Sequence, residues 1–109
     1  MTDRSGSRAG ALLQMLGLAA RAGAVVPGTD RVREAARNGS LRIALVAADA
    51  SENSRDKLLP LLQSRQIPYE IVFDRESLGG AVGKSPLSAL GITEEKLASR
   101  VKELIATTE

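Results

Sequence analysis

Hydrophobic positions in this chain follow two alternating patterns, one typical of helices and one typical of strands. Ahead of Gly23, apolar residues fall at helical spacing, as a helix with one face in the core requires: Leu12, Met15, Leu16 and Ala19. Leu41–Ala47, in contrast, is a nearly continuous apolar run, LRIALVA. Such a run is typical of a central strand that is covered on both faces. The change between the two patterns predicts an α/β chain.

The rest of the chain repeats this alternation at short spacing. Further helices are predicted over about residues 29–38, 52–65 and 75–82 and after Thr93, and further strands before Pro27 and at Tyr69–Phe73 and Leu87–Leu90. Ser51, Asp74 and Thr93 are the predicted N-caps of the last three helices, because their oxygens accept hydrogen bonds from free helical N–H groups. Pro60 is expected to kink the 52–65 helix or to end its first half. This order of elements predicts a three-layer α/β/α sandwich.

The length of the chain fits one domain with a single core. Residues 1–8 are small and polar and are expected to form a flexible N-terminal tail, followed by one α/β/α domain over residues 9–109. The apolar segment after Gly10 resembles the core of a signal peptide, but Gln14 and Gly17 interrupt it and it is too short to span a bilayer. We therefore expect a cytoplasmic protein that has no membrane partner.

The composition removes most catalytic chemistries. The chain has no cysteine and no histidine, so it lacks a thiolate nucleophile, a histidine base and the commonest metal ligands. We expect neither an enzyme nor a metal site nor a bound cofactor. Tyr69 and Phe73 are the only aromatic residues, which argues against a sheet that stacks several nucleobases.

Charge is distributed unevenly along the chain. The total is +2, but residues 1–48 carry +4 and the remainder carries −2. A basic half of this kind weakly favours a partner with a phosphate backbone. Charges of this size are also common in proteins that bind no nucleic acid.

The junction at Pro27-Gly28 is the most informative point of the sequence. A short strand ends there and a helix begins at Thr29-Asp30. Glycine lets the backbone approach a ligand closely because it has no Cβ, and free N–H groups at the start of a helix attract anions. The junction therefore favours a phosphate-bearing partner, although the same turn is ordinary in α/β proteins.

A second glycine-rich segment, GGAVGKS at Gly79–Ser85, resembles a nucleotide-binding P-loop only superficially. A P-loop requires a glycine five residues before its second glycine, and counting back from Gly83 gives Leu78 instead. The context is also wrong, because a helix precedes the segment and Pro86 follows it. We expect no nucleotide cofactor, although Lys84 and the serine after it remain candidate phosphate donors in an ordinary loop.

Four motifs follow one another along the chain: LGLAARAG, PGTDRV, ALVAADASEN and LGGAVGKSP. In this order they resemble the kink-turn-binding ribosomal-protein superfamily, and within it the small bacterial YlxQ/YbxF-like branch, over about Leu12–Leu90. The resemblance implies a sandwich around a small mixed four-stranded sheet. It also implies a non-catalytic protein that recognises a kink-turn or a similarly bent RNA and is associated with the ribosome or its assembly.

By this resemblance, two elements contact the RNA: the start of the helix after the glycine, which reads base edges, and a second loop, which covers an unstacked base. The helix contributes Gly28, Thr29, Asp30, Arg31, Arg33, Glu34 and Arg37. The loop contributes Lys84, Ser85, Pro86, Leu87 and Ser88. Guanidinium groups match both phosphates and guanine edges, Lys84 offers a point charge, and Leu87 offers the apolar cover.

The helix start departs from the family pattern in its charges. Typical members have asparagine and then Glu or Gln where this chain has Asp30 and Arg31. An aspartate accepts hydrogen bonds but donates none, and Asp30 and Glu34 put negative charge near the expected phosphates, each at a cost on the order of 1 kcal/mol. The alternative hypothesis is therefore the same fold with weakened RNA reading, which serves as a protein-interaction module in translation or transcription.

Several of these residues also have purely structural explanations. Asp30 suits a helix cap or a first-turn acid, and Leu87 suits the core. Surface ion pairs at helical spacing suit Asp30–Arg33 and Glu34–Arg37. A helix start suits Ser51–Ser54, and the loosened end of a short helix suits Gly79 and Gly80.

Overall fold

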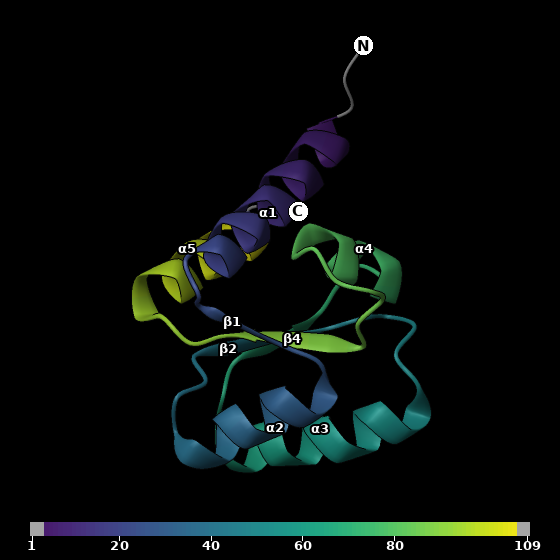
Figure 1. Cartoon of the computed structure of the whole chain (residues 1–109), viewed down its shortest axis with the longest axis vertical. Helices are drawn as coiled ribbons and strands as arrows, with labels where there is room; N and C mark the ends of the chain where they lie inside the picture. Colours follow the sequence, from purple (N-terminus) through teal and green to yellow (C-terminus); the bar gives the residue numbers. More distant parts are fainter. Residues whose placement is uncertain (1–3, 107–109) are drawn as a thin grey trace.

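The computed structural model describes residues 4–106, with side chains from residue 9 onward, as five helices and four strands in regular alternation (Figure 1). The helices are α1 (Arg4–Arg21), α2 (Thr29–Asn38), α3 (Glu52–Ser64), α4 (Arg75–Ala81) and α5 (Glu95–Ala106). The strands are β1 (Val25–Pro27), β2 (Ile43–Val46), β3 (Tyr69–Ile71) and β4 (Ala89–Ile92). Helices α1, α4 and α5 cover one face of the sheet and α2 and α3 cover the other, which confirms the three-layer sandwich.

The sheet has the strand order β1-β4-β2-β3. Strands β2 and β3 run parallel, whereas β4 pairs antiparallel with both β1 and β2, so the expected mixed four-stranded sheet is confirmed. Because β4 is antiparallel to its neighbours, the loop that leads into it emerges at the edge where β1 and β2 end. This topology decides which loops lie next to the start of α2.

The two inner strands form the centre of the core. Every residue of β2 and β4 is buried, and Leu45 and Leu90, which are register partners, are fully inaccessible to solvent. The predicted apolar run is therefore a strand covered on both faces, although the strand itself is limited to Ile43–Val46. Below the sheet, Val32, Ala35 and Ala36 are the buried face of α2, and their small size lets this helix pack closely against the sheet.

Two of the three predicted caps are confirmed and one is wrong. Ser51 and Asp74 accept hydrogen bonds from the N–H groups of residues 54 and 77, at 3.1 and 2.8 Å. Hydrogen bonds from Ser77, first from its backbone N–H, hold the pKa of Asp74 below its ordinary value. Helix α5 is capped instead by Glu94, whose carboxylate accepts from the N–H of Leu97 at 2.8 Å. Thr93 is drawn away because its N–H and hydroxyl both bond the Ala24 carbonyl.

Helix α3 continues through Pro60 to Ser64, so the proline does not end its first half. Leu58 and Leu62 are fully buried on either side of it, and this burial holds the helix on the sheet at the expense of one backbone hydrogen bond. The strand expected at Leu87–Leu90 begins two residues later, at Ala89. Leu87 belongs to the preceding loop, where its N–H bonds the Arg75 carbonyl at 3.0 Å.

The backbone is helical from Arg4, within the segment that the sequence suggests is a flexible tail, and residues 1–3 lie outside the described residues. The division into a tail over residues 1–8 and a domain over residues 9–109 stays a prediction. Within the described range, none of the helices combines the length and the apolar character that a bilayer crossing needs.

Gly79 and Gly80 occupy neighbouring positions in α4 but have very different surroundings. A Cβ on Gly79 would lie 2.1 Å from the carbonyl oxygen of Ser85, whereas a Cβ on Gly80 would meet nothing within 4 Å. The loop after α4 therefore packs directly on Gly79, and the Gly79 carbonyl accepts the N–H of Lys84 at 2.8 Å. Gly79 is required for this close approach. The structural explanation suggested by the sequence, that glycine loosens the helix end, therefore applies to Gly80 alone.

We expect Gly79→Ala to destabilise the protein by about 1–3 kcal/mol, because the added methyl group must displace the backbone at Ser85. Gly80→Ala is the matched control and should leave the free energy of unfolding unchanged or raise it by up to about 1 kcal/mol, as alanine favours a helix. Urea unfolding measures both. Equal effects of the two substitutions would contradict the close approach at Gly79.

Candidate nucleic-acid interface

One hydrogen bond joins the two elements that the sequence nominates as a site. The N–H of Gly28, just past the end of β1, donates to the carbonyl of Ala89, the first residue of β4, at 2.8 Å. Pro27 and Leu90 are register partners in the same pair of strands. The start of α2 and the loop before β4 are therefore held side by side at one edge of the sheet.

Gly28 is the N-cap of α2 and has a backbone conformation that other residues avoid, with φ 98° and ψ 154°. Glycine has no side-chain oxygen that could cap the helix. The first helical hydrogen bond runs from the N–H of Val32 to the Gly28 carbonyl at 3.0 Å. The N–H groups of Thr29, Asp30 and Arg31 have no hydrogen-bond partner among the described residues. They leave the N-terminus of a ten-residue helix open to an anion.

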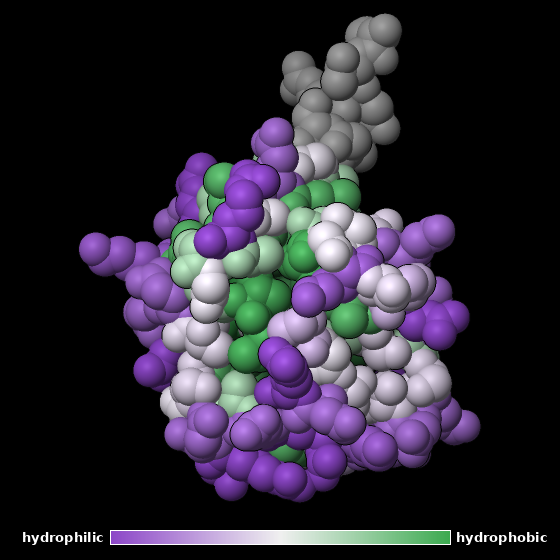
Figure 2. All heavy atoms as spheres, viewed as in Figure 1, coloured by the Kyte–Doolittle hydropathy of each residue, from purple (hydrophilic) through white to green (hydrophobic). Residues whose placement is uncertain are grey.

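A hollow of about 360 Å³ separates the first turn of α2 from the loop before β4. Its lining comes from both elements: Pro27, Arg31, Lys84, Ser85, Pro86 and Leu87. A second hollow of about 230 Å³ shares Pro27, Arg31 and Lys84 with the first and continues over Ala20, Val25 and Val82. Figure 2 shows apolar side chains gathered at the level of the sheet between α1 and α2, with hydrophilic side chains around them. Together the hollows offer an apolar floor beside two cations.

The loop backbone is fixed while its tip is exposed. The N–H groups of Lys84 and Leu87 bond the carbonyls of Gly79 and Arg75, and the Ser88 carbonyl accepts the N–H of Ala47 at 2.8 Å. Lys84, Ser85 and Pro86 are exposed. Leu87 is half-buried against the core and also lines the larger hollow, so its two expected roles are compatible in geometry.

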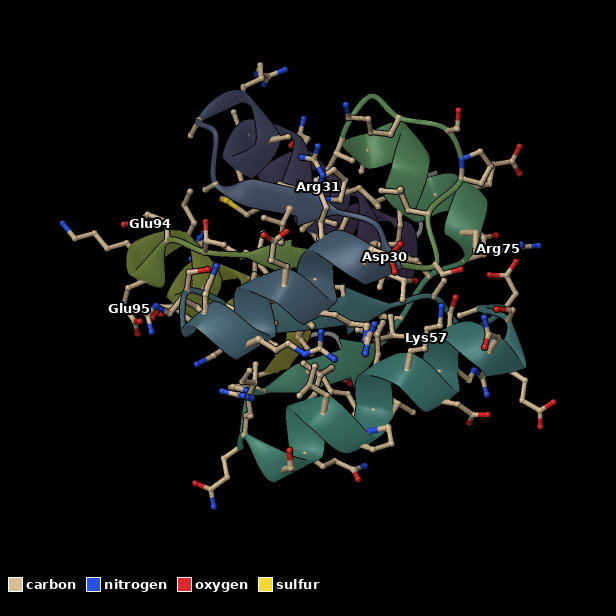
Figure 3. All side chains as sticks on the ribbon, turned by 60° about the horizontal axis from the view of Figure 1, so that its bottom comes forward. Asp30, Arg31, Lys57, Arg75, Glu94 and Glu95 are labelled. Atoms are coloured by element: carbon tan, nitrogen blue, oxygen red, sulfur yellow. The ribbon has the colours of Figure 1, made fainter. Side chains whose placement is uncertain are left out.

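Asp30 and Arg31 both belong to the first turn of α2 and both are exposed (Figure 3). Arg31 extends between α1 and the loop after α4, where it lines both hollows and has no ion-pair partner in the described part of the chain. Asp30 is a first-turn acid and not the cap, since the cap position belongs to Gly28. Its carboxylate favours the helix but opposes an incoming phosphate.

The Thr29 hydroxyl is already engaged. It donates to the Ser54 hydroxyl of α3 at 3.2 Å, so the N–H is the hydrogen-bond donor of Thr29 that remains free for a ligand. The Ser51–Ser54 run is thus more than a helix start, because it also ties α3 to the beginning of α2. No sequence signal singles out this contact, since the two residues lie 25 positions apart.

Arg33, Glu34 and Arg37 are not brought to the hollow beside the loop. With Asp30 and Asn38 they line a separate hollow of about 460 Å³ on α2. Arg33 is half-buried, and its Nε atom is buried without a hydrogen-bond partner. Among the ion pairs of the described residues there is neither an Asp30–Arg33 nor a Glu34–Arg37 pair. The expected surface pairs are therefore absent from this part of the chain.

Sequence reasoning also missed a contact at the neighbouring strand ends. Asp49, just after β2, accepts the backbone N–H of Arg75 at 2.8 Å and pairs with its guanidinium at 3.5 Å. This contact fixes the start of α4, which in turn carries the loop. An acidic residue three positions after a buried strand was the available signal, but its partner lies 26 positions away.

The chemical groups of the interface suit the binding of a ligand. Among the described residues, no three His, Cys, Asp or Glu side chains converge as a metal ligand set. Asp74 has a shifted pKa, but the shift comes from a helix-capping hydrogen bond. Free helical N–H groups, a guanidinium, an ammonium and an apolar floor are suited to an anionic ligand with an apolar part.

The fold and the site define a small α/β/α protein with a candidate binding surface at the ends of its strands, and comparison with known proteins supplies the family. The chain belongs to the ribosomal protein L7Ae/L30e/S12e/Gadd45 family, whose model matches residues 10–102. It is 33% identical over 91 residues to the RNA-binding protein YlxQ of Bacillus subtilis, covering 84% of this chain and 91% of that protein. It is also 33% identical over 93 residues to the RNA-binding protein YlxQ of Enterococcus faecium, covering 85% of this chain and 89% of that protein.

Two solved structures are similar to the fold. A protein of unknown function from Bacillus halodurans superimposes with a TM-score of 0.82 at 34% identity, covering 87% of this chain and 96% of that one. The 15.5 kD RNA-binding protein of Giardia lamblia has a TM-score of 0.76 at 21% identity, covering 99% of this chain and 90% of that one. The second similarity is one of fold alone. These comparisons confirm the expected family and its YlxQ-like branch.

We expect Gly28→Ala to destabilise the protein by about 1–3 kcal/mol, because a Cβ strains the positive-φ backbone although nothing lies near it. Gly10→Ala is the control, since Gly10 lies in α1 with equally open surroundings. This substitution should raise the free energy of unfolding by up to about 1 kcal/mol, because alanine favours a helix. Thermal or urea unfolding compares them. Unchanged stability of Gly28→Ala would mean that the junction relaxes to an ordinary turn.

Proposed function

We propose that this protein binds RNA without catalysing a reaction, and that its target is a kink-turn or a similarly bent RNA. The single observation that carries the proposal is the shared hollow between the first turn of α2 and the loop before β4. It joins two elements that are distant in sequence into one surface with free N–H groups and two cations. The YlxQ relatives, named as RNA-binding proteins, support the same function.

The chemistry of the hollow suits a bent RNA better than a regular duplex. A sharp bend exposes phosphates on one side and leaves a base unstacked, so that it needs an apolar cover. Arg31 and Lys84 provide the phosphate contacts, and the apolar residues around Pro27 and Leu87 provide the cover. Recognition then depends on the shape of the RNA and on its backbone, since the described interface has no aromatic platform.

Of the twelve residues expected to contact RNA, we assign direct roles to those that line this hollow. Arg33 and Arg37 lie further along α2 and serve the flanking backbone, whereas the Glu34 carboxylate in the same hollow opposes phosphate. Association with the ribosome and action in the cytoplasm are parts of the same proposal. A protein-interaction module with lost RNA reading is less favoured, because the relatives at 33% identity are named for RNA binding.

We expect Arg31→Ala to weaken binding to a kink-turn oligonucleotide by about 1–3 kcal/mol, because it removes the guanidinium from the hollow. Arg100→Ala is the matched control. Arg100 lies on α5 in an exposed pair with Glu103, so its loss should leave RNA affinity nearly unchanged. Fluorescence anisotropy across a salt series measures both, and wild-type affinity should fall steeply with salt. Absence of wild-type binding at low salt would remove the proposal.

We expect Asp30→Asn to strengthen RNA binding, because it removes a carboxylate from the phosphate-facing turn and adds a hydrogen-bond donor. The gain should be on the order of 1 kcal/mol at low salt and smaller at high salt. Folding stability should fall by only a few tenths of a kcal/mol, since Asp30 favours the helix dipole but is not the cap. Equal or weaker RNA binding would show that the carboxylate is not an obstacle.

A further inference from the structure

Another hollow, lined by basic residues, lies at the opposite end of α2 from the proposed RNA site. Its volume is about 380 Å³, and its charged lining is Arg42, Arg65, Lys102 and Glu95 over a floor that includes Leu41 and Ile67. The lining residues lie where α2 and α3 end, where β2 and β3 begin, and in α5. Figure 3 shows Glu95 at the end of α2 that is remote from Asp30 and Arg31. We name this feature the distal hollow.

Two of the three cations of the distal hollow, Arg42 and Arg65, have a polar contact, and these contacts leave most of their donors available. The Arg65 guanidinium donates one hydrogen bond to the Arg37 carbonyl at 3.4 Å, which leaves most of its donors free. Arg42 pairs with Glu95 at 3.6 Å, yet their side chains are 47% and 71% exposed. An exposed pair of this kind is weak, so a phosphate can compete with the carboxylate for Arg42. Lys102 is exposed and forms no ion pair among the described residues.

Helix α2 separates the two hollows, and its length sets how much RNA stem is needed to reach from one to the other. Helix α2 has ten residues and is therefore about 15 Å long. At roughly 3 Å of rise per base pair, a duplex covers that length in about five base pairs. Exposed Arg37 lies in the last turn of α2 and Arg33 lies one turn before it, so cations follow Arg31 along the helix, with Glu34 among them.

We propose that the distal hollow binds backbone phosphates of the stem that flanks the bent motif. This inference rests on the proposed RNA-binding function and extends it: the ligand is a bent motif together with at least one further half-turn of duplex. Arginine suits phosphate through its planar fork of donors. A protein partner fits less well, because Leu18 and Ile71, the exposed large hydrophobic residues of the described chain, both lie outside the distal hollow and cannot anchor an interface there.

The test compares two RNAs with the same kink-turn and closing loops, one with flanking stems of about 3 base pairs and one with stems of about 12. Wild type should bind the long RNA about tenfold more tightly. The triple variant R42Q/R65Q/K102Q should lose this advantage, and the slope of log affinity against log salt should fall by about 2 to 3 for the long RNA. Its affinity for the short RNA should stay the same.

A second variant guards against misfolding of the first. Glu95→Gln removes the carboxylate that opposes phosphate and frees Arg42, so it should increase affinity for the long RNA two- to threefold and leave the short RNA unchanged. Arg31→Ala should weaken binding of both RNAs alike.

The outcomes separate the two proposals. If wild type binds neither RNA, the function and this inference fall together. If it binds both RNAs equally, or if the triple variant and Glu95→Gln both leave long-RNA affinity unchanged, the inference is wrong and the function stands. A third outcome is that wild type binds polyglutamate, that the triple variant loses this binding, and that RNA affinity does not depend on stem length. This outcome would assign the distal hollow to an acidic protein segment and overturn the inference.

Discussion

The antiparallel insertion of β4 between β1 and β2 is the constraint on which the interface depends. It turns the loop before β4 toward the edge where β1 ends, and the hydrogen bond from Gly28 to Ala89 then fixes the loop and the start of α2 side by side. With β4 beyond β3, at the other edge of the sheet, β2 and β3 would separate the start of α2 from the loop before β4. The binding surface is therefore a product of strand order, and the buried centre of the sheet, around Leu45 and Leu90, provides the stability that holds it.

The interface combines opposing charges within one helical turn. Asp30 stabilises α2 through the helix dipole, whereas the free N–H groups and Arg31 in the same turn attract anions. Arg31 has no partner among the described residues, and Asp30 does not neutralise it across the turn. The surface therefore keeps its attraction for phosphate but with reduced strength, which suits a ligand recognised by the fit of several contacts. In the proposed complex, the basic residues at the far end of the helix enlarge the contact area.

The sequence predicted the layers, the helix at 29–38, the buried central strand and two of the caps, because these follow from local periodicity and local hydrogen bonds. It failed where distant contacts decide. Thr93 is a good capping residue but its hydroxyl is claimed by Ala24, and Pro60 is tolerated because Leu58 and Leu62 are buried. In the site, Arg31 and the 84–87 loop came together as the motifs implied. Arg33, Glu34 and Arg37 did not join them, and the contact of Thr29 with Ser54 had no signal in the sequence.

The seating of the 84–88 loop on Gly79 has a consequence for how such a surface diversifies. The loop backbone packs against a helix and a strand end before any ligand binds. The loop therefore loses little conformational entropy when the ligand binds. Lys84, Ser85 and Pro86 are exposed, although the backbone of Lys84 and Ser85 packs on Gly79. Substitution of these side chains can alter ligand preference without disturbing the fold. Substitution of Gly79, in contrast, must move the whole 84–88 loop.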